Sequence, residues 1–473
     1  MKPHNRKTPT ATQDSSSADG VLPTLGDKIA NYAVAAILVL VPFHALLTVW
    51  LSQLVGHYDL LRIWKEVLLL LITPLVAYLA WKTPDLWQRI RSSWLMWALA
   101  CYVVLQVGLG LIALAKHQVN SYALLYAWVV NLRFVLLFAV AFVLAARSSW
   151  LHDRWKMLLI WPAVVVIMFG LLQRFVLPHD FLMHLGYNAA TIAPYETVDQ
   201  KLDYVRVQST LRGANPLGAY LVIALTALMA LLLRNKRDRA QIAGITVLSA
   251  GLLVLVATYS RSAYIGVFIA GLAAVALVVH GRQAKRRLAY GLAAIIAVAG
   301  LALLTLRTND RFENVFFHTD EHSQSQMSSN QQRSTAYQAA WDDVLAEPFG
   351  RGPGTAGPAS QHNDRPERIA ENYYLQVVQE TGWPGLLVLL VILFMVFKRL
   401  WMRRHDVLAR VLLASLLGIS FINLTSHAWT DDTLALVWWG LAGVACVPAI
   451  INTTAATKGK QTGHGKKANT RTT

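Results

Sequence analysis

Long apolar stretches constrain this chain more than any other feature of its sequence. A helix needs about 20 apolar residues to cross the hydrocarbon core of a bilayer. Only 15% of the 473 residues are charged and 55% are hydrophobic, whereas soluble domains carry about 25% charged residues. We therefore expect an all-α polytopic membrane protein. Reading the apolar runs between charged markers predicts twelve spans, at roughly 29–51, 60–81, 94–115, 122–146, 157–177, 213–233, 240–258, 262–280, 288–306, 384–400, 407–427 and 433–452.

The positive charges predict how these spans are oriented. The chain has a net charge of +17, and 28 of its 43 basic residues fall in seven clusters that flank apolar runs and mark alternate loops. Basic loops stay in the cytoplasm, whereas a soluble nucleic-acid-binding domain would not distribute its charge in this way. We expect no nucleic-acid partner, a bacterial inner membrane location, and two cytoplasmic tails, a disordered one at 1–28 and a basic one at 453–473.

Motifs for cofactors and metals are missing from the sequence. There is no GxxxxGK[ST] phosphate loop, and the two cysteines, Cys101 and Cys446, lie inside apolar runs, where they favour packing over a disulfide or zinc cluster. We expect no cofactor and no metal.

Two loops are too long to be simple connectors. The first, at about 178–212, interrupts the nine spans of 29–306, and the second, at 307–383, precedes the last three spans at 384–452. The alternation of spans predicts that both are periplasmic. A helix is expected at 331–346, with Tyr337, Trp341, Val344 and Leu345 on one face. Loops of this length usually carry function.

Candidate catalytic residues gather on the same predicted periplasmic side. Arg206 and Arg212 precede the sixth span, Arg261 lies in the tight turn between the seventh and eighth, and His362 and Glu371 lie in the large loop. Arginine at membrane depth is costly unless it meets an anion, and its planar fork suits a diphosphate. A lipid-headgroup anchor or an ion pair with a loop carboxylate is the alternative for Arg261.

Two further charged residues lie within predicted spans. Arg133 is about twelve residues from the outer start of the fourth span, and Lys65 stands beside Glu66 near the outer end of the second. Buried charge in a span suggests function, so both are candidate contacts of a lipid carrier. For Lys65 a structural ion pair with Glu66 is the favoured interpretation.

A set of motifs resembles the O-antigen ligase and polymerase superfamily, and within it the lipopolysaccharide O-antigen ligases. The similar segments lie within residues 205–385, in the order and spacing of the family. They are Arg212-Gly213 with Asn215-Pro216-Leu217-Gly218, then Ser260-Arg261-Ser262-Ala263, then Arg333 to Trp341 with Glu347-Pro-Phe-Gly-Arg-Gly-Pro-Gly, and Glu371-Asn372-Tyr-Tyr-Leu-Gln-Val-Val-Gln-Glu380-Thr-Gly-Trp-Pro-Gly385.

The resemblance implies a fold, a reaction and partners. Family members are glycosyltransferases of GT-C-like architecture that move a glycan from undecaprenyl diphosphate to an acceptor hydroxyl, without nucleotide or metal. For this chain it implies an undecaprenyl diphosphate-linked glycan as donor, the lipid A-core oligosaccharide as acceptor, and surrounding membrane lipids. Periplasmic arginines and a histidine are the essential groups, so Arg206 or Arg212, Arg261 and His362 are the implied catalytic residues. The motif residues Asn215, Asn372 and Tyr373 are implied substrate contacts.

One departure from the family pattern leaves the base open. Many relatives have a histidine directly before the Asn of the Asn-x-Tyr-Leu stretch, where this chain has Glu371. The base is therefore His362, Glu371, or His362 oriented by Glu371. A general base takes the proton of a sugar hydroxyl, and histidine suits that work near neutral pH.

Other functions share parts of this pattern. A polymerase of the superfamily would use another lipid-linked repeat as acceptor, and a protein O-oligosaccharyltransferase would use Ser or Thr. A transporter or flippase, the alternative from a different class, would place polar groups near the midplane of two similar halves. Here the candidate groups gather at one face, which favours the transferase.

Overall fold

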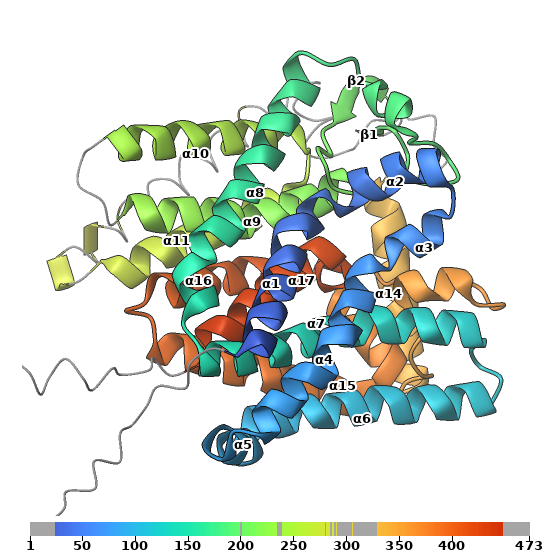
Figure 1. Cartoon of the computed structure of the whole chain (residues 1–473). Coiled ribbons are helices and arrows are strands. Elements are labelled where there is room, and N and C mark those ends of the chain that lie inside the picture. The colour runs from blue at the N-terminus through green and yellow to red at the C-terminus, as the bar shows by residue number, and fades with distance from the viewer. Residues whose placement is uncertain are drawn as a thin grey trace, which may run out of the picture.

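The computed structural model describes residues 24–198, 201–233, 239–279 and 329–447, with a few single positions between 281 and 305. It confirms an all-α polytopic membrane protein: within these ranges, eight helices are long and apolar enough to cross a membrane. The elements, in chain order (Figure 1), are α1 (Leu25–Leu40), η1 (Val41–Phe43), α2 (His44–Val55), α3 (Tyr58–Arg62), α4 (Trp64–Trp81), α5 (Pro84–Arg91), α6 (Trp94–Ala115), α7 (Ser121–Arg147), α8 (Trp150–Phe175), η2 (Phe181–Leu185), β1 (Glu196–Val198), β2 (Lys201–Arg206), α9 (Ala214–Leu232), α10 (Arg239–Ala257), α11 (Arg261–Val278), α14 (Ser329–Ala346), η4 (Gly357–His362), α15 (Tyr373–Met402), α16 (Val407–Ile422), η5 (Ala428–Thr430) and α17 (Asp432–Ala445).

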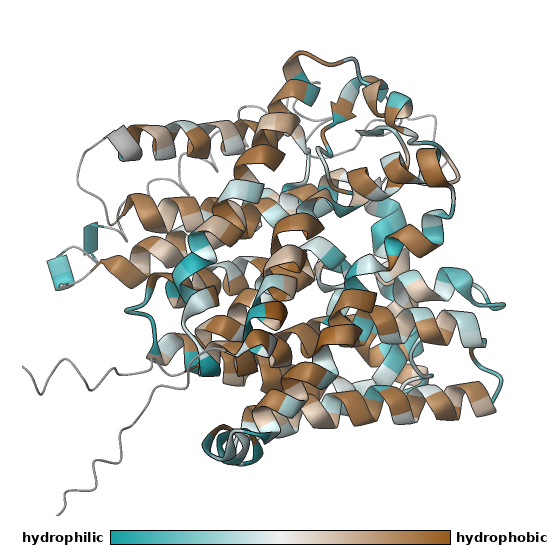
Figure 2. Cartoon of the chain, viewed as in Figure 1, coloured by the Kyte–Doolittle hydropathy of each residue, from teal (hydrophilic) through white to brown (hydrophobic). Residues whose placement is uncertain are grey.

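The helices lie over the expected spans. The first span is longer than expected, because α1, η1 and α2 run on without a break over Leu25–Val55. Three shorter apolar helices, Gln241–Ala257 within α10, α16 and α17, lie over the seventh, eleventh and twelfth. The ninth expected span at 288–306 and the two tails lie almost wholly outside the described residues. Figure 2 shows that the long helices are mostly hydrophobic, with hydrophilic residues gathered towards their ends.

The core is built around α7, α9, α16 and α17. Trp429, Trp438 and Trp439 are fully buried there and contact one another edge to face or tilted. Helices α11 and α16 come into backbone contact, because Gly266 and Gly418 face each other where a Cβ atom would clash with a carbonyl. Small residues permit such close helix packing in membranes. This contact sets the positions of the loop before α11 and the loop after α16.

A short antiparallel hairpin, β1 paired with β2, interrupts the otherwise helical chain and pairs Glu196 with Arg206. Six helices, α4, α7, α9, α11, α15 and α17, begin towards the end of the bundle where this hairpin lies, which we call the hairpin end (Figure 1). These helices are the second, fourth, sixth, eighth, tenth and twelfth expected spans. Their common starting end is what alternating spans require.

A buried ion pair joins three helices at the opposite end. Arg147, the last residue of α7, donates from Nε and Nη2 to both carboxylate oxygens of Asp27 at 2.5 and 3.0 Å. Its Nη1 donates to the carbonyl of Leu79 at 3.2 Å and to the hydroxyl of Thr83. Bidentate pairing of this kind fixes geometry as well as charge. It ties together the ends of α1, α4 and α7 that lie away from the hairpin.

Helix α15 begins at Tyr373, well before the expected start at 384. Asn372 caps it, accepting from the backbone N–H groups of Tyr374 and Leu375 at 2.9 and 3.1 Å. The helix is interrupted at Gly382, where φ is 69°, a left-handed conformation that favours glycine. The loop 348–354 pairs with this opened backbone, because Arg351 and Gly352 donate to the carbonyls of Gln379 and Glu380.

The helix expected at 331–346 is confirmed as α14, but its apolar face differs from the expectation. Val344 is buried, with Ala340, against Ala370, Leu375 and Val378. The other three residues of the expected face are exposed: Tyr337, Trp341 and Leu345. Helix α14 packs on α15 and on the segment before it through Ala340 and Val344, so these two residues are covered and the other three are not.

Candidate active site

Two adjoining cavities open at the hairpin end and share Arg212. The smaller, which we call the arginine cavity, has a volume of about 160 Å³. The larger, which we call the lateral cavity, has a volume of about 390 Å³. The arginine cavity is lined by Arg212, Asn215, Pro216, Ala219, Ser260, Ser262, Ala263, Glu371, Ile422, Ser426, His427, Ala428 and Asp431. The lateral cavity is lined by Asp59, Leu60, Arg62, Ile63, Lys65, Glu66, Tyr122, Leu125, Tyr126, Val129, Val130, Arg133, Arg212, Pro358, Thr430 and Asp432.

Four helices begin at the arginine cavity: α9, α11, α15 and α17. The first N–H groups of a helix have no partner within it and carry partial positive charge. In α15 and α17 side chains satisfy some of them, because Asn372 and Asp431 accept cap hydrogen bonds. In α9 and α11 no side chain caps the helix. Two uncapped N-termini therefore face the cavity, an arrangement that suits an anion.

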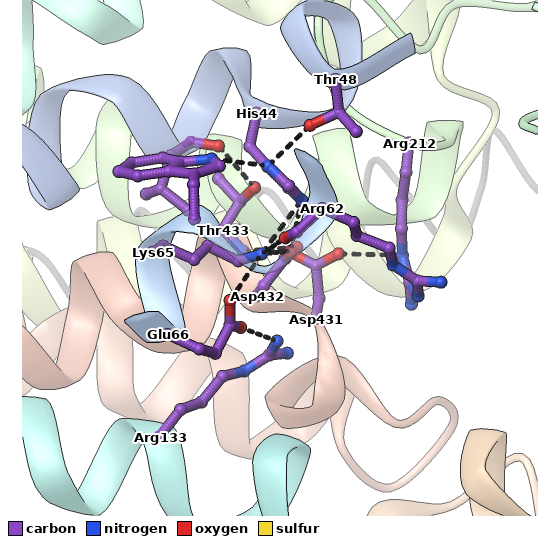
Figure 3. A network of polar contacts seen from close by, with 12 residues as sticks. His44, Thr48, Arg62, Lys65, Glu66, Arg133, Arg212, Asp431, Asp432 and Thr433 are labelled. Carbon is purple, nitrogen blue, oxygen red and sulfur yellow. Dashed lines mark hydrogen bonds and ion pairs between the residues drawn. The ribbon is translucent and has the colours of Figure 1, made fainter. Parts of the chain in front are cut away.

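Arg212 directs its guanidinium at the place where the two cavities meet. Its Nε lies 3.2 Å from Oδ2 of Asp431, which is 5% exposed, whereas the Arg212 side chain is 37% exposed. Figure 3 shows the two terminal nitrogens pointing away from Asp431. Within the described part of the chain no partner is seen for them. Arg212 thus has a counterion on one side and an open fork on the other.

Arg206 is used differently, although it is only six residues away. All three of its nitrogens bind the protein: Nε donates to the carbonyl of Thr258 at 2.9 Å, Nη1 to Glu196 at 3.2 Å and Nη2 to Asn215 at 2.6 Å. Burial lowers the pKa of Arg206, and the carboxylate of Glu196 opposes that shift. Arg206 therefore joins the hairpin to the start of α9 and holds Asn215 at the cavity wall.

Arg261 is the first residue of α11 and is half-buried. Its neighbours Ser260 and Ser262 line the arginine cavity, while the Arg261 side chain is not among the lining groups and has an interaction partner. The structure thus brings the Ser-Arg-Ser turn to the cavity through its serines and its helix N-terminus.

Glu371 and His427 face the same arginine cavity from different elements. Glu371 directly precedes the cap of α15 and has a φ of 51°, which is unusual for a residue with a side chain. His427 lies in the turn after α16. Burial lowers the pKa of His427 below its ordinary value, Glu371 opposes the shift, and Arg212 and Arg333 add to it. His427 is therefore neutral near pH 7.

His362 lies elsewhere. Its ring is 5.1 Å from the ring of Tyr122 and 4.6 Å from that of Tyr126, two residues of the lateral cavity. Its carbonyl accepts from the side chain of Asn120 at 2.9 Å, which fastens η4 to the start of α7. His362 and Glu371 thus belong to the surroundings of different cavities, and the structure does not bring them together as a pair.

Lys65 and Arg133 belong to a buried polar network that lines part of the lateral cavity (Figure 3). Lys65 is 2% exposed, and its Nζ lies 3.1 Å from Asp432, 3.3 Å from Glu66 and 3.0 Å from Nε2 of His44. Arg133 donates to Glu66 at 3.1 Å and to the carbonyl of Thr430 at 2.7 Å. Replacing one member would leave a buried charge without its partner, which is strongly destabilising. The contacts agree with the ion-pair interpretation of Lys65.

Asn372 and Tyr373 are turned into the protein. The Asn372 side chain caps α15 and donates to the carbonyl of Leu424 at 3.0 Å. Tyr373 is 2% exposed and contacts Tyr374. Neither lines the arginine cavity or the lateral cavity, in contrast to Asn215, which lines the arginine cavity. In the described ranges, no group of three or more His, Cys, Asp or Glu residues is placed to hold a metal ion.

His427 and Asp431 were not predicted from the sequence. Both fall in Ser426-His-Ala-Trp-Thr-Asp-Asp, a polar stretch between two short apolar helices. The span expected at 407–427 ends at His427, whereas α16 ends at Ile422. The signal in the sequence was the concentration of ionisable residues at this boundary, because such residues are costly at membrane depth.

Comparison with known proteins agrees with the motifs. No curated protein matches the chain. The family model described as O-antigen ligase matches residues 245–390, which include Arg261 and Glu371 and leave Arg212 and His427 outside. The matched segment carries the Ser-Arg-Ser turn and the start of α15, so residues 245–390 are similar to the O-antigen ligase family.

Proposed function

We propose that the protein is an O-antigen ligase, which transfers a glycan from undecaprenyl diphosphate to a sugar hydroxyl of the lipid A core at the periplasmic face. The family match supports a ligase or polymerase of lipid-linked glycans. The observation that carries the proposal is the open fork of Arg212 beside the uncapped N-termini of α9 and α11. Fixed positive charge of this kind stabilises a diphosphate leaving group without reorganisation.

The two cavities suit the two parts of a lipid-linked donor. The lateral cavity has an apolar rim, in which Leu60 and Leu125 are 67% and 58% exposed. Such residues at the surface of a spanning bundle face lipid, so a polyprenyl chain can remain in the bilayer while its diphosphate reaches Arg212. Arg62, which also lines the lateral cavity and donates to the hydroxyl of Tyr126 at 2.8 Å, is a second cation that can contact the diphosphate. The diphosphate is then held where the cavities meet.

The acceptor hydroxyl approaches from the arginine cavity. Glu371, Asn215 and His427 line it and can orient a sugar by hydrogen bonds. The bond from the glycan to its diphosphate stores the free energy of the reaction, so the transfer needs no nucleotide. The polar groups that line the arginine cavity lie at one end of the bundle, near the starts of α9, α11, α15 and α17, whereas a transporter would carry its binding groups near the midplane of two similar halves.

The decisive experiment is a lipopolysaccharide gel of a strain lacking the gene. We expect loss of all long chains from the lipid A core, with polymer still present on the carrier lipid. Core carrying a single repeat would instead identify a polymerase, and an unchanged ladder would contradict transfer altogether. Wild-type protein supplied from a plasmid should restore the ladder, and Arg212→Lys should not. The variant Arg154→Lys serves as the matched control, because Arg154 lies on α8, outside the lining of both cavities, with its guanidinium 4.5 Å from the ring centroid of Trp150 on the same helix.

A further inference from the structure

The arginine cavity contains a histidine that the family motifs do not include. We propose that His427 and Glu371 act as the acid–base pair of the transfer, with His427 receiving the proton of the acceptor hydroxyl and Glu371 stabilising the imidazolium that forms. This inference rests on the proposed function. It assigns the role of base to a histidine on the turn after α16, rather than to the position before Asn372 or to His362.

The geometry supports the pairing. His427 and Glu371 line one cavity together with Arg212, although they are 56 positions apart in the sequence, at 427 and 371. Glu371 has a left-handed backbone, with a φ of 51°. Such a conformation persists only where the surroundings enforce it, and it is common at active sites. The backbone of Tyr373 donates to the carbonyls of Asn423 and Ser426, at 2.9 and 3.2 Å, so the start of α15 and the turn before His427 are fastened together.

The charges around His427 suit a base. Burial lowers the pKa of His427, Glu371 raises it, and Arg212 and Arg333 lower it. Asp431 also lines the cavity, with its carboxylate 3.2 Å from Arg212. The imidazole is therefore neutral before the reaction, as a base must be. When it takes up a proton, the carboxylate of Glu371 is the nearby group that stabilises the new charge.

The step balances without any further reactant. The acceptor oxygen forms a bond to the anomeric carbon of the glycan, while the bond from that carbon to the diphosphate oxygen breaks. The electron pair of the broken bond leaves with the lipid diphosphate, which Arg212 holds. The proton of the acceptor hydroxyl passes to a ring nitrogen of His427 and is later released to water. No oxidant, metal or nucleotide takes part.

The imidazole can be replaced without removing the contacts that shape its turn. The backbone carbonyl of His427 accepts from the backbone N–H and the hydroxyl of Thr430 at 3.0 and 2.7 Å. A glutamine at this position keeps both bonds. We therefore expect His427→Gln to fold, to elute as the wild-type protein does, and to retain radiolabelled undecaprenyl diphosphate, because the diphosphate contacts come from Arg212.

The test is a pH–rate profile of the full chain in lipid nanodiscs, with undecaprenyl diphosphate-linked O-antigen and purified lipid A-core as probes. The wild-type rate should fall as the pH drops through the pKa of His427, because protonation removes the base. His427→Gln should lose about 10²-fold in rate and should lose this acidic limb. Glu371→Gln should keep the limb but move it to lower pH, because the carboxylate that raises the pKa of His427 is gone. His405→Gln, at an exposed turn at the opposite end, is the control.

Several outcomes would overturn the inference while leaving the proposed function intact. Wild-type rate and an unchanged limb in His427→Gln would exclude His427. Loss of the limb in Glu371→Gln, with its retention in His427→Gln, would make Glu371 the base alone. Loss of the limb in His362→Gln only would make His362 the base. Failure of His427→Gln to retain undecaprenyl diphosphate would assign His427 to donor binding. Absence of transfer by the wild-type protein would instead contradict the proposed function itself.

Discussion

Arg206 and Arg212 are only six positions apart in the sequence, yet they have different roles in the structure. All three side-chain nitrogens of Arg206 donate hydrogen bonds to other residues of the protein. In Arg212 one nitrogen pairs with Asp431, and the other two point towards the cavities. The sequence predicted that one of them contacts the diphosphate, and the contacts favour Arg212. The choice could not be made from sequence, because it depends on where Glu196, Asn215 and Thr258 meet in space.

Substituting Arg212 should affect the reaction more than the fold. Arg212→Lys keeps the charge but loses the planar fork, so it is not conservative at a bidentate site. We expect a loss of about 10²–10³-fold in transfer rate, as for removal of a preorganised charge stabiliser. The measurement is the transfer rate of purified variants at matched folded concentration. A rate within twofold of wild type would show that Arg212 has only a structural pairing with Asp431.

Substituting Arg206 should affect the stability of the fold more than the transfer reaction. The guanidinium of Arg206 reaches three separate acceptors, the carbonyl of Thr258 and the side chains of Glu196 and Asn215. The single ammonium of Arg206→Lys cannot reach all three, so some of these hydrogen bonds are lost. Buried groups left without partners cost about 1–3 kcal/mol each. We expect Arg206→Lys to lower the thermal unfolding midpoint, as measured by circular dichroism in detergent. An unchanged midpoint with abolished transfer would mean that Arg206, and not Arg212, binds the diphosphate.

At the scale of elements, helix starts and helix contacts make the site. The uncapped N-termini of α9 and α11 and the capped ones of α15 and α17 meet because α11 and α16 pack with their glycines in contact. The apolar spans could be predicted from periodicity and length. The start of α15 at Tyr373 could not, because Asn372 and the loop 348–354 continue the helix beyond the apolar run.

The α11–α16 contact gives a prediction with a matched control. Gly418→Ala places a methyl group against the carbonyl of Gly266, where neither backbone can yield cheaply. Overpacking typically costs about 1–3 kcal/mol, so we expect a lower unfolding midpoint and reduced transfer. Gly108→Ala, in α6, meets no atom within 4 Å and should be neutral or slightly stabilising. Equal midpoints for the two variants would contradict the close packing.

The whole molecule is organised by the alternation of its spans. Basic clusters at alternate loops predicted that the hairpin end faces the periplasm, and the candidate site residues of the described ranges gather at that end. Composition and charge were enough to predict the polytopic fold. They could not predict His427, because its role depends on a turn that brings it beside Glu371.

Cysteine labelling tests this orientation. In a background with Cys101→Ala and Cys446→Ala, the exposed positions 367 and 405 lie at opposite ends of the bundle. Glu367→Cys should react with a membrane-impermeant maleimide in intact spheroplasts, because the distribution of basic residues predicts that its loop is periplasmic. His405→Cys should react only after permeabilisation. Reaction of both, or of His405→Cys alone, before permeabilisation would reverse the orientation and remove the periplasmic site.

The central claim is that this chain alone moves a glycan between two lipids. Its most direct test is the purified wild-type protein in nanodiscs with undecaprenyl diphosphate-linked O-antigen and lipid A-core, without ATP and with excess EDTA. We predict long-chain lipopolysaccharide as product, together with released undecaprenyl diphosphate. Activity that requires ATP, or that EDTA abolishes and a divalent ion restores, would contradict the proposed mechanism. No transfer under any of these conditions would contradict the proposed function.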